Sequence, residues 1–308
     1  MNSVPLVSLI IISYNQKAFI DDCMKSLLQL TYSNIELLYL DDCSPDETFT
    51  GACLYEERAR EKFGKVYFEK NKVNKGLIYN LNCLIQKSSG KYIKFLSADD
   101  FLLEDSITNM VDFMENHPES DMLYSNAVYG EGDTHFPLNG SEQLPRLYVG
   151  EQLSGTGLFE RLYESDFIAA PTVMTKKEVY DKLGLYDASL GIEDWDYFLR
   201  IARKGNIGYL DKVTVMYRFS NDSLSHSDNP IRRINMQKSE LLIREKYKKF
   251  VQNSKRLIRK SFNNAYQDAL HIDDKAYFDF LEAYAKRNQI GKSAGNHLRF
   301  LLYKLKIL

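Results

Sequence analysis

Apolar runs of strand length alternate with segments of helical periodicity along the first 130 residues, and this alternation constrains the fold most. Residues 6–12, 35–40 and 92–96 are apolar runs of the length that buried strands have. Each of them is followed by a segment whose apolar residues recur at helical spacing. Such β-α-β alternation predicts an α/β fold with a mostly parallel sheet, right-handed crossovers and flanking helices.

The rest of the chain continues this pattern and then changes to helices. Pro171 lies inside one apolar run, which predicts that this strand lies at a sheet edge or contains a bulge. Residues 130–150 are rich in Gly and Pro and are predicted to form a loop, and the chain after Pro230 is predicted to be helical. Further strands are expected at 66–68, 122–129, 167–175 and within 207–219, and helices at 16–30, 45–63, 76–86, 104–116, 151–164, 176–183 and 193–204.

Charge divides the 308 residues into two unequal parts. Residues 231–308 carry 18 basic and 7 acidic side chains, whereas the rest of the chain has a net charge of −13. We therefore expect an α/β domain at 1–229, with halves at about 1–100 and 101–229, and a basic helical region at 230–308. The basic region either meets an anionic partner or surface or has a solvated basic face.

The composition is typical of a soluble globular protein, with 44% hydrophobic and 27% charged residues. The four cysteines form no CxxC pair, so neither a zinc ribbon nor a thioredoxin-like motif is indicated. We see no signal peptide and no apolar run of transmembrane length, and we expect a cytoplasmic protein.

Polar residues follow three of the predicted strands at the point where each strand ends. Ser13-Tyr14-Asn15 follows the first strand, Asp41-Asp42 the second, and Ser97-Ala98-Asp99-Asp100 the strand at 92–96. The carboxyl ends of parallel strands form the edge at which α/β sheets bind ligands. Adjacent carboxylates there repel each other unless something positive neutralises them, which indicates a site for a cation or a charged ligand.

Several segments in this order resemble the family 2 inverting glycosyltransferases, which have a GT-A fold. They are VSLIIISYN, YLDDCSPDET, NKVNKGLIYN, GKYIKFLSADD, FIAAPTVMTKKEVYDKLGLYD, IEDWDYFLRIARKG and VMYRFS, and together they cover about residues 5–225. The resemblance implies transfer of a sugar from a nucleoside diphosphate, most simply UDP, to a hydroxyl of a saccharide or lipid-linked saccharide. Polysaccharide or glycoconjugate synthesis would be the setting, with no nucleic acid among the partners.

The resemblance also implies which residues bind the nucleotide. Asp41 and Asp42 would bind its base and sugar, although Asp, Ser and Pro in DDCSPD also suit a simple turn. Related enzymes often have an Arg eight residues after Asn71, and Tyr79 stands there in this chain. Lys75 would then supply the positive charge, unless it is simply solvated. The full set of expected nucleotide-binding residues is Ser13, Tyr14, Asp41, Asp42, Asn71, Lys75, Ser97 and Arg218.

The family's metal motif is Asp-x-Asp, and here Ser97 replaces its first Asp. The resemblance therefore implies that Asp99, followed by Asp100, binds Mn²⁺ or Mg²⁺, cations that suit carboxylate and phosphate oxygens. His226 is a further candidate for the metal or a phosphate. Without the resemblance, Asp99 and Asp100 would be read as residues that cap the next helix.

The Glu193-Asp194 pair supplies the expected catalytic residue. In the family, the Asp of this pair is the general base that deprotonates the acceptor hydroxyl, which points to Asp194. Glu193 and Trp195 would support the acceptor side, and Glu193 and Asp196 are neighbours able to raise the pKa of Asp194. Acidic residues also favour the first turn of a helix for purely structural reasons.

Two other functions and two other roles for the C-terminal region stay open. Ser97 and Tyr79 suit an inactive module that only binds sugar nucleotides, and a nucleotidyltransferase would need a Gly-rich basic loop after the first strand. The C-terminal leucines form an apolar stripe with basic neighbours that would dock on the inner face of an anionic membrane, or pack on the α/β domain or on a second copy of the chain. The stripe consists of Leu298, Leu301, Leu302 and Leu305.

Overall fold

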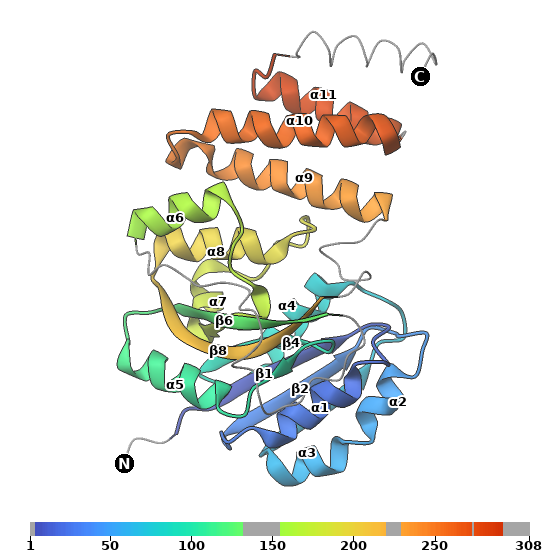
Figure 1. Cartoon of the computed structure of the whole chain (residues 1–308), viewed down its shortest axis with the longest axis vertical. Coiled ribbons are helices and arrows are strands. Elements are labelled where there is room, and N and C mark those ends of the chain that lie inside the picture. Colours follow the sequence, from blue (N-terminus) through green and yellow to red (C-terminus); the bar gives the residue numbers. More distant parts are fainter. Residues whose placement is uncertain (1–3, 132–154, 220–228, 273, 292–308) are drawn as a thin grey trace.

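The computed structural model describes residues 4–131, 155–219, 229–272 and 274–291. Their strands are β1 (Val7–Ser13), β2 (Ile35–Asp41), β3 (Lys65–Lys70), β4 (Tyr92–Ser97), β5 (Phe101–Leu102), β6 (Met122–Glu131), β7 (Met174–Lys176) and β8 (Ile207–Phe219). Within the described residues they form one sheet in the order β3-β2-β1-β4-β7-β6-β8-β5 (Figure 1).

The sheet is mixed, with parallel pairing in its first half. β1 pairs in parallel with β2 and β4, β2 with β3, and β6 with β8. Antiparallel pairs join β7 to β4 and β6, and β5 to β8. The carboxyl ends of β1, β2 and β4 meet at one edge, where Ser13 pairs with Asp41 and Ile12 with Ser97. The predicted α/β fold with a mostly parallel sheet is confirmed.

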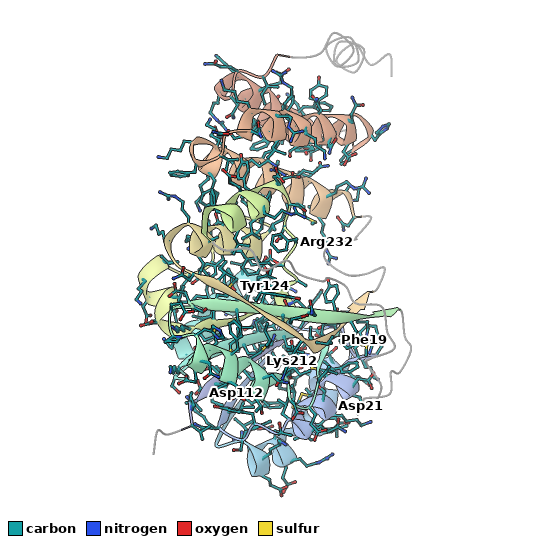
Figure 2. All side chains as sticks on the ribbon, turned by 60° about the vertical axis from the view of Figure 1, so that its left-hand side comes forward. Phe19, Asp21, Asp112, Tyr124, Lys212 and Arg232 are labelled. Atoms are coloured by element: carbon teal, nitrogen blue, oxygen red, sulfur yellow. The ribbon has the colours of Figure 1, made fainter. Side chains whose placement is uncertain are left out.

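Helices cover both faces of the sheet (Figure 1). One face packs against α1 (Ile20–Gln29), α2 (Thr48–Cys53), α3 (Glu56–Lys62) and α5 (Ser106–Asn116). The other face packs against α4 (Leu77–Lys87), α6 (Gly155–Glu164), α7 (Lys177–Leu183) and α8 (Glu193–Lys204). Figure 2 shows Tyr124 on this second face of the sheet and Asp112 on α5, the helix that covers part of the first face.

Two predicted helices differ from those observed. Residues 45–63, predicted as one helix, form α2 and α3, because the chain breaks at Tyr55, whose hydroxyl bonds Asp21 of α1. The helix predicted to begin at residue 16 begins at Ile20, after a turn in which the Phe19 N–H donates to the Gln16 carbonyl. In both cases the observed helix is shorter than the periodicity alone predicts.

The prediction of an edge strand at 167–175 is wrong. Pro171 lies in a 3-10 turn, Ala170–Thr172, and the strand β7 begins after it. β7 lies between β4 and β6, inside the sheet. Because Pro171 precedes the strand, its missing N–H removes no hydrogen bond from the sheet, and the interior position is possible.

The C-terminal region forms three stacked helices above α6 and α8 (Figure 1). They are α9 (Pro230–Tyr247), α10 (Ser254–Ile272) and α11 (Lys275–Arg287), with a core of their own that includes Phe262 and Tyr284. Tyr247 and Leu257 join the core of the α/β domain, so residues 230–291 pack on that domain. The leucine stripe at 298–305 lies outside the described residues, as does most of the predicted loop at 130–150. Among the described helices, none is both long and apolar enough to cross a bilayer.

Candidate active site

Asp41 is a buried organiser of the turn after β2. It is fully buried, and its carboxylate accepts hydrogen bonds from Ser13 Oγ (3.0 Å), Ser44 N (2.8 Å) and Ser44 Oγ (2.5 Å). Lys70 Nζ lies 3.9 Å from the same carboxylate. Cys43, between Asp42 and Ser44, has a φ of 64°, so the turn depends on this network to hold a left-handed residue. Asp41 therefore shapes the base of the site.

Asp42 connects this turn to the start of α4. Its carboxylate accepts hydrogen bonds of 2.8 Å from Asn71 Nδ2, from the Lys75 N–H and from the Gly76 N–H. Gly76 has a φ of 83°, a backbone conformation that residues other than glycine rarely adopt. The predicted residues Asp42, Asn71 and Lys75 are thus brought together at the carboxyl edge of the sheet.

Lys75, just before α4, and Tyr79, on its first turn, form an exposed pair. Lys75 Nζ lies 4.7 Å from the centre of the Tyr79 ring and 3.4 Å from its hydroxyl. The positive charge thus lies at the position where the resemblance expects an Arg. Tyr14, which directly follows β1, is 44% exposed. The rings of Tyr14 and Tyr79 are therefore both accessible to a ligand.

The segment after β4 presents one partly exposed carboxylate and hides the next. Asp99 is half-buried, and its backbone carbonyl accepts a 3.0 Å hydrogen bond from Arg218 Nε. Asp100 is 2% exposed, and its carboxylate accepts from the Arg218 N–H at 2.8 Å. Ser97 Oγ accepts from Gln16 Nε2 at 3.1 Å. The Asp99 carboxylate is therefore the better placed of the two for a ligand.

Arg218 is a buried residue that holds this segment through its hydrogen bonds to Asp99 and Asp100. It is 2% exposed, its guanidinium lies 3.1 Å from the Asp22 carboxylate, and it stacks 4.6 Å from the centre of the Phe19 ring. Asp22 and Phe19 come from α1 and the turn before it, and sequence reasoning did not single them out. Arg218 thus positions the Asp99–Asp100 segment, and its contact with a diphosphate stays a prediction.

A second buried cation, Lys94, lies within β4 itself. It is fully buried, and its ammonium group donates to the backbone carbonyls of Phe95 (3.1 Å) and Pro171. Burial lowers the pKa of Lys94 to about 7, although the nearby Asp100 acts in the opposite direction. Burial and then the charge of Asp99 raise the pKa of Asp100 well above its usual range. Sequence reasoning missed Lys94, although a Lys inside the apolar run YIKFL was a visible signal.

Glu193 and Asp194 lie on the first turn of α8, beside β4. Both are half-buried and line a narrow cavity of about 20 Å³, together with Ile93 and Phe95 of β4. Asp194 Oδ1 accepts a 2.7 Å hydrogen bond from the Trp195 N–H. The same strand thus carries the Asp99 segment at its end and contacts the Asp194 cavity along its length.

Burial raises the pKa values of both carboxyl groups. The pKa of Glu193 rises to about 8, first through burial and then through the charge of Asp194. Burial also raises the pKa of Asp194, against the opposing effect of the Trp195 N–H. Carboxylates with raised pKa values are suited to accept a proton near neutral pH.

Trp195 is buried in the protein core and is not accessible to an acceptor. It is 3% exposed, and its indole N–H donates to the Leu162 carbonyl at 2.7 Å. His226, the remaining predicted residue, lies outside the described part of the chain. In that described part, no three His, Cys, Asp or Glu side chains converge as a complete metal site. Asp99 would therefore need oxygens from the ligand to complete the coordination of a cation.

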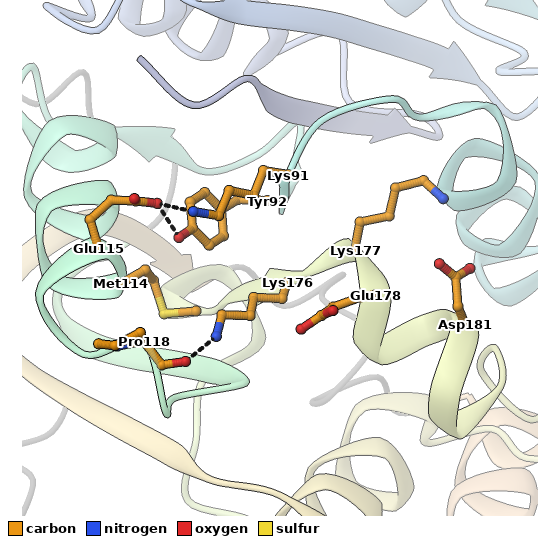
Figure 3. Close-up of a pocket in the computed structure, with 9 residues that line it drawn as sticks. All are labelled: Lys91, Tyr92, Met114, Glu115, Pro118, Lys176, Lys177, Glu178 and Asp181. Carbon is orange, nitrogen blue, oxygen red and sulfur yellow. Dashed lines mark hydrogen bonds and ion pairs between the residues drawn. The ribbon is translucent and has the colours of Figure 1, made fainter. Parts of the chain in front are cut away.

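A larger hollow of about 360 Å³ lies at the opposite end of β4 (Figure 3). Two of its three lysines already have partners, because Lys91 Nζ lies 2.5 Å from Glu115 and Lys176 Nζ donates to the Pro118 carbonyl at 2.5 Å. None of the predicted site residues lines this hollow. The predicted site residues Ser13, Asp41 and Ser97 lie instead at the carboxyl edge of the sheet.

Sequence comparison relates this chain to a family of known proteins. Residues 8–184 match the family described as glycosyl transferase family 2. An uncharacterized glycosyltransferase of Haemophilus influenzae is 25% identical over 90% of each chain. The Escherichia coli UDP-Glc:alpha-D-GlcNAc-diphosphoundecaprenol beta-1,3-glucosyltransferase WfaP is 31% identical over 65% of this chain and 71% of its own.

Solved structures share the fold at low sequence identity. S. aureus TarS 1-349 in complex with UDP-GlcNAc superposes with a TM-score of 0.61 at 16% identity, over 92% of this chain and 80% of its own. The mannosyltransferase PcManGT from Pyrobaculum calidifontis, in complex with GDP-Man and Mn²⁺, superposes with a TM-score of 0.59 at 13% identity, over 99% and 81%. Because the family match covers more than half of the 308 residues, this chain belongs to glycosyl transferase family 2 and is a glycosyltransferase.

Proposed function

We propose that this enzyme transfers a sugar from UDP to a hydroxyl of a saccharide acceptor, with inversion at the anomeric carbon and with the help of Mn²⁺ or Mg²⁺. The observation that carries the proposal is the juxtaposition at β4. A partly exposed carboxylate, Asp99, follows the end of this strand, and two carboxylates with raised pKa values lie beside the strand at the start of α8. The first suits a cation and the second pair suits proton transfer.

The nucleotide would lie over the Asp41–Asp42 turn. Tyr14 follows β1 and Tyr79 lies on α4, and both rings are exposed, with the exposed cation Lys75 beside Tyr79. Ser13, Asp41 and Asn71 would act mainly by holding the turn, because their polar groups already bond to protein atoms. Ser97 would offer a hydroxyl to the ribose. A UDP donor is also supported by the UDP-Glc in the name of WfaP and by the UDP-GlcNAc bound to TarS.

Asp99 would hold the divalent cation together with diphosphate oxygens, and Asp100 would fix the segment from behind. An oxygen ligand with an open side is the donor type that Mg²⁺ and Mn²⁺ prefer. When bound, such a cation neutralises the charge that develops on the leaving diphosphate. The Mn²⁺ present with GDP-Man in PcManGT supports divalent cation use in proteins of this fold.

Asp194 would be the general base. In a direct displacement, the acceptor oxygen attacks the anomeric carbon on the face opposite the diphosphate, and the product has the inverted configuration. The acceptor hydroxyl must lose its proton as it attacks, and a half-buried carboxylate with a raised pKa can accept that proton. Glu193 shares the cavity, and the charge of Asp194 helps to raise the pKa of Glu193.

The acceptor would be a saccharide on a lipid carrier, used in polysaccharide or glycoconjugate synthesis at the cytoplasmic face of a membrane. The diphosphoundecaprenol-linked acceptor in the name of WfaP supports this class. The Bacillus subtilis relative TuaG, 27% identical and named for teichuronic acid biosynthesis, supports the setting. Reversible contact of the basic C-terminal region with anionic lipid would bring the enzyme to such an acceptor.

A panel of nucleotide sugars tests the proposal. Release of the nucleoside diphosphate is measured for UDP-, GDP- and dTDP-sugars, with Mn²⁺, with Mg²⁺ and with a chelator. We expect release from a UDP-sugar that the chelator abolishes, and a transfer product of inverted configuration by NMR. Binding of UDP-sugars without release or transfer under any condition would instead favour the inactive binding module, to which Ser97 and Tyr79 point.

A further inference from the structure

Helix α9 of the C-terminal region contacts the segment that carries Asp194 on both sides of this residue. On the N-terminal side, the Gly191 N–H donates a 2.6 Å hydrogen bond to Ser239 Oγ of α9. Ser239 is buried, and its hydroxyl donates in turn to the Asn235 carbonyl at 2.7 Å. The chain is therefore attached to α9 three residues before Asp194.

On the C-terminal side, Asp196 makes the second attachment. This carboxylate is fully buried, and it accepts hydrogen bonds from Lys246 Nζ at 2.7 Å and from the Tyr247 hydroxyl at 3.0 Å. Both partners belong to the last turn of α9. Within α8, Arg200 Nη2 donates to the other carboxylate oxygen at 2.6 Å. A buried carboxylate is strongly destabilising without such partners, so this network fixes the distance between α8 and α9.

Trp195, the residue between Asp194 and Asp196, provides a third contact. The Arg244 guanidinium of α9 lies 5.1 Å from the Trp195 ring. Arg244 Nη1 also donates to the Tyr163 carbonyl at 2.7 Å, and the Tyr163 hydroxyl donates back to the Arg244 carbonyl at 2.9 Å. The first turn of α8 is thus attached to both α6 and α9.

We propose that α9 is a positioning element for Asp194, with the Asp196–Lys246–Tyr247 network as its main attachment. The inference rests on the proposed role of Asp194 as general base. Proton transfer requires the base within hydrogen-bond reach of the acceptor hydroxyl, and a displacement of about 1 Å can lower turnover about 10²-fold. The donor site lies on β1, β2 and β4, which α9 does not contact through these residues. Loosening α9 should therefore affect the chemical step and spare donor binding.

The test compares Lys246→Met with Lys246→Arg and with the wild type. We expect Lys246→Met to lower kcat about 10- to 100-fold, with the KM for the UDP-sugar and the Kd for UDP within about twofold of wild type. Lys246→Arg keeps a cation in reach of Asp196 and should recover most of the turnover. Lys248→Met is the matched control, because Lys248 Nζ bonds Asn288, the residue after α11, at 2.7 Å and lies 3.9 Å from Glu245 of α9, and neither of these partners is Asp196. It should leave kcat unchanged.

A second variant keeps the test decisive if Lys246→Met folds poorly. Tyr247→Phe removes one hydroxyl from the network and should also lower kcat, with normal UDP binding and a normal circular dichroism spectrum. The inference is overturned if Tyr247→Phe and every folded Lys246 variant keep wild-type kcat, or if kcat falls only in step with loss of UDP binding. Absence of turnover in the wild type would instead overturn the proposed function, and this inference with it.

Discussion

Arg218 and Asp100 are 118 residues apart in the sequence, yet the Arg218 N–H donates a 2.8 Å hydrogen bond to the Asp100 carboxylate. This bond ties β8 to the segment after β4, where the proposed cation ligand Asp99 lies. The Arg218 guanidinium extends the connection to Asp22 of α1. The segment is thus held from two directions before any ligand binds.

Loss of the Arg218 side chain should destabilise the fold. Arg218→Met leaves Asp22 without this partner and is expected to lower the free energy of unfolding by about 3 kcal/mol, as for a broken buried ion pair. Arg60→Met is the control, because Arg60 forms an exposed pair with Glu56 and should cost less than about 1 kcal/mol. Urea denaturation of both variants measures the difference. If Arg218→Met and Arg60→Met lower the free energy of unfolding equally, the buried Arg218 ion pair contributes no more than an exposed one.

Asp99→Ala should separate cation-dependent from cation-independent nucleotide binding. We expect UDP to bind this variant with the same affinity with and without Mn²⁺, whereas Mn²⁺ should strengthen UDP binding to the wild type. Asp112→Ala, an exposed carboxylate on α5, is the matched control and should behave like the wild type. Calorimetric titration with UDP distinguishes the cases. If Mn²⁺ still strengthens UDP binding to Asp99→Ala, another residue holds the cation.

The Glu193–Asp194 pair predicts an unusual pH profile. Because a general base must be deprotonated, the raised pKa of Asp194 means that kcat falls with decreasing pH at a value above the ordinary Asp pKa of about 4. Ionisation of Glu193, whose pKa is about 8, places a second negative charge beside Asp194 and should increase kcat further. Glu193→Gln should keep the first transition and lose the one near pH 8. A wild-type profile that is flat from pH 5 to pH 9 would contradict the assignment.

Lys94 makes a prediction about stability. Its pKa is about 7 in the folded protein, whereas an unfolded Lys has a pKa of about 10.4, so between these values the unfolded state binds more protons. The free energy of unfolding should therefore rise as pH increases from about 7 to about 10. Lys94→Met should lack this rise, and Lys91→Met, an exposed control before the same strand, should keep it. The same pH dependence in Lys94→Met and the wild type would rule out the buried charge as its cause.

Much of the fold was predictable because the strands of an α/β sheet are short apolar runs. α8 was predicted with its observed bounds, because its apolar stripe and Gly205 mark both its face and its end. β5, with two residues, is too short to carry a pattern, and it exists only because Phe101 and Leu102 pair with β8. The turn at Pro171 depends likewise on packing, because Lys94 holds its carbonyl from the neighbouring strand.

The proximity of the candidate site residues was predictable where they follow strand ends, and not where it depends on distant contacts. Asp42, Asn71 and Lys75 come together because β2 and β3 are parallel neighbours and α4 follows them. The attachment of Asp196 to Lys246 joins segments 50 residues apart through a helix whose position no local pattern reports. The same holds for Asp22, which meets Arg218 across 196 residues.

The central claim is that Asp194 performs the proton transfer while the strand ends hold the donor. The most direct measurement is turnover of a UDP-sugar by Asp194→Asn, alongside the Kd for UDP in the presence of Mn²⁺, with Asp181→Asn on the exposed side of α7 as control. The account predicts a fall in kcat of about 10²- to 10⁴-fold, with the Kd within about twofold of wild type and no change for Asp181→Asn. Turnover of Asp194→Asn within tenfold of wild type, or a loss of UDP binding that parallels the loss of turnover, would contradict it.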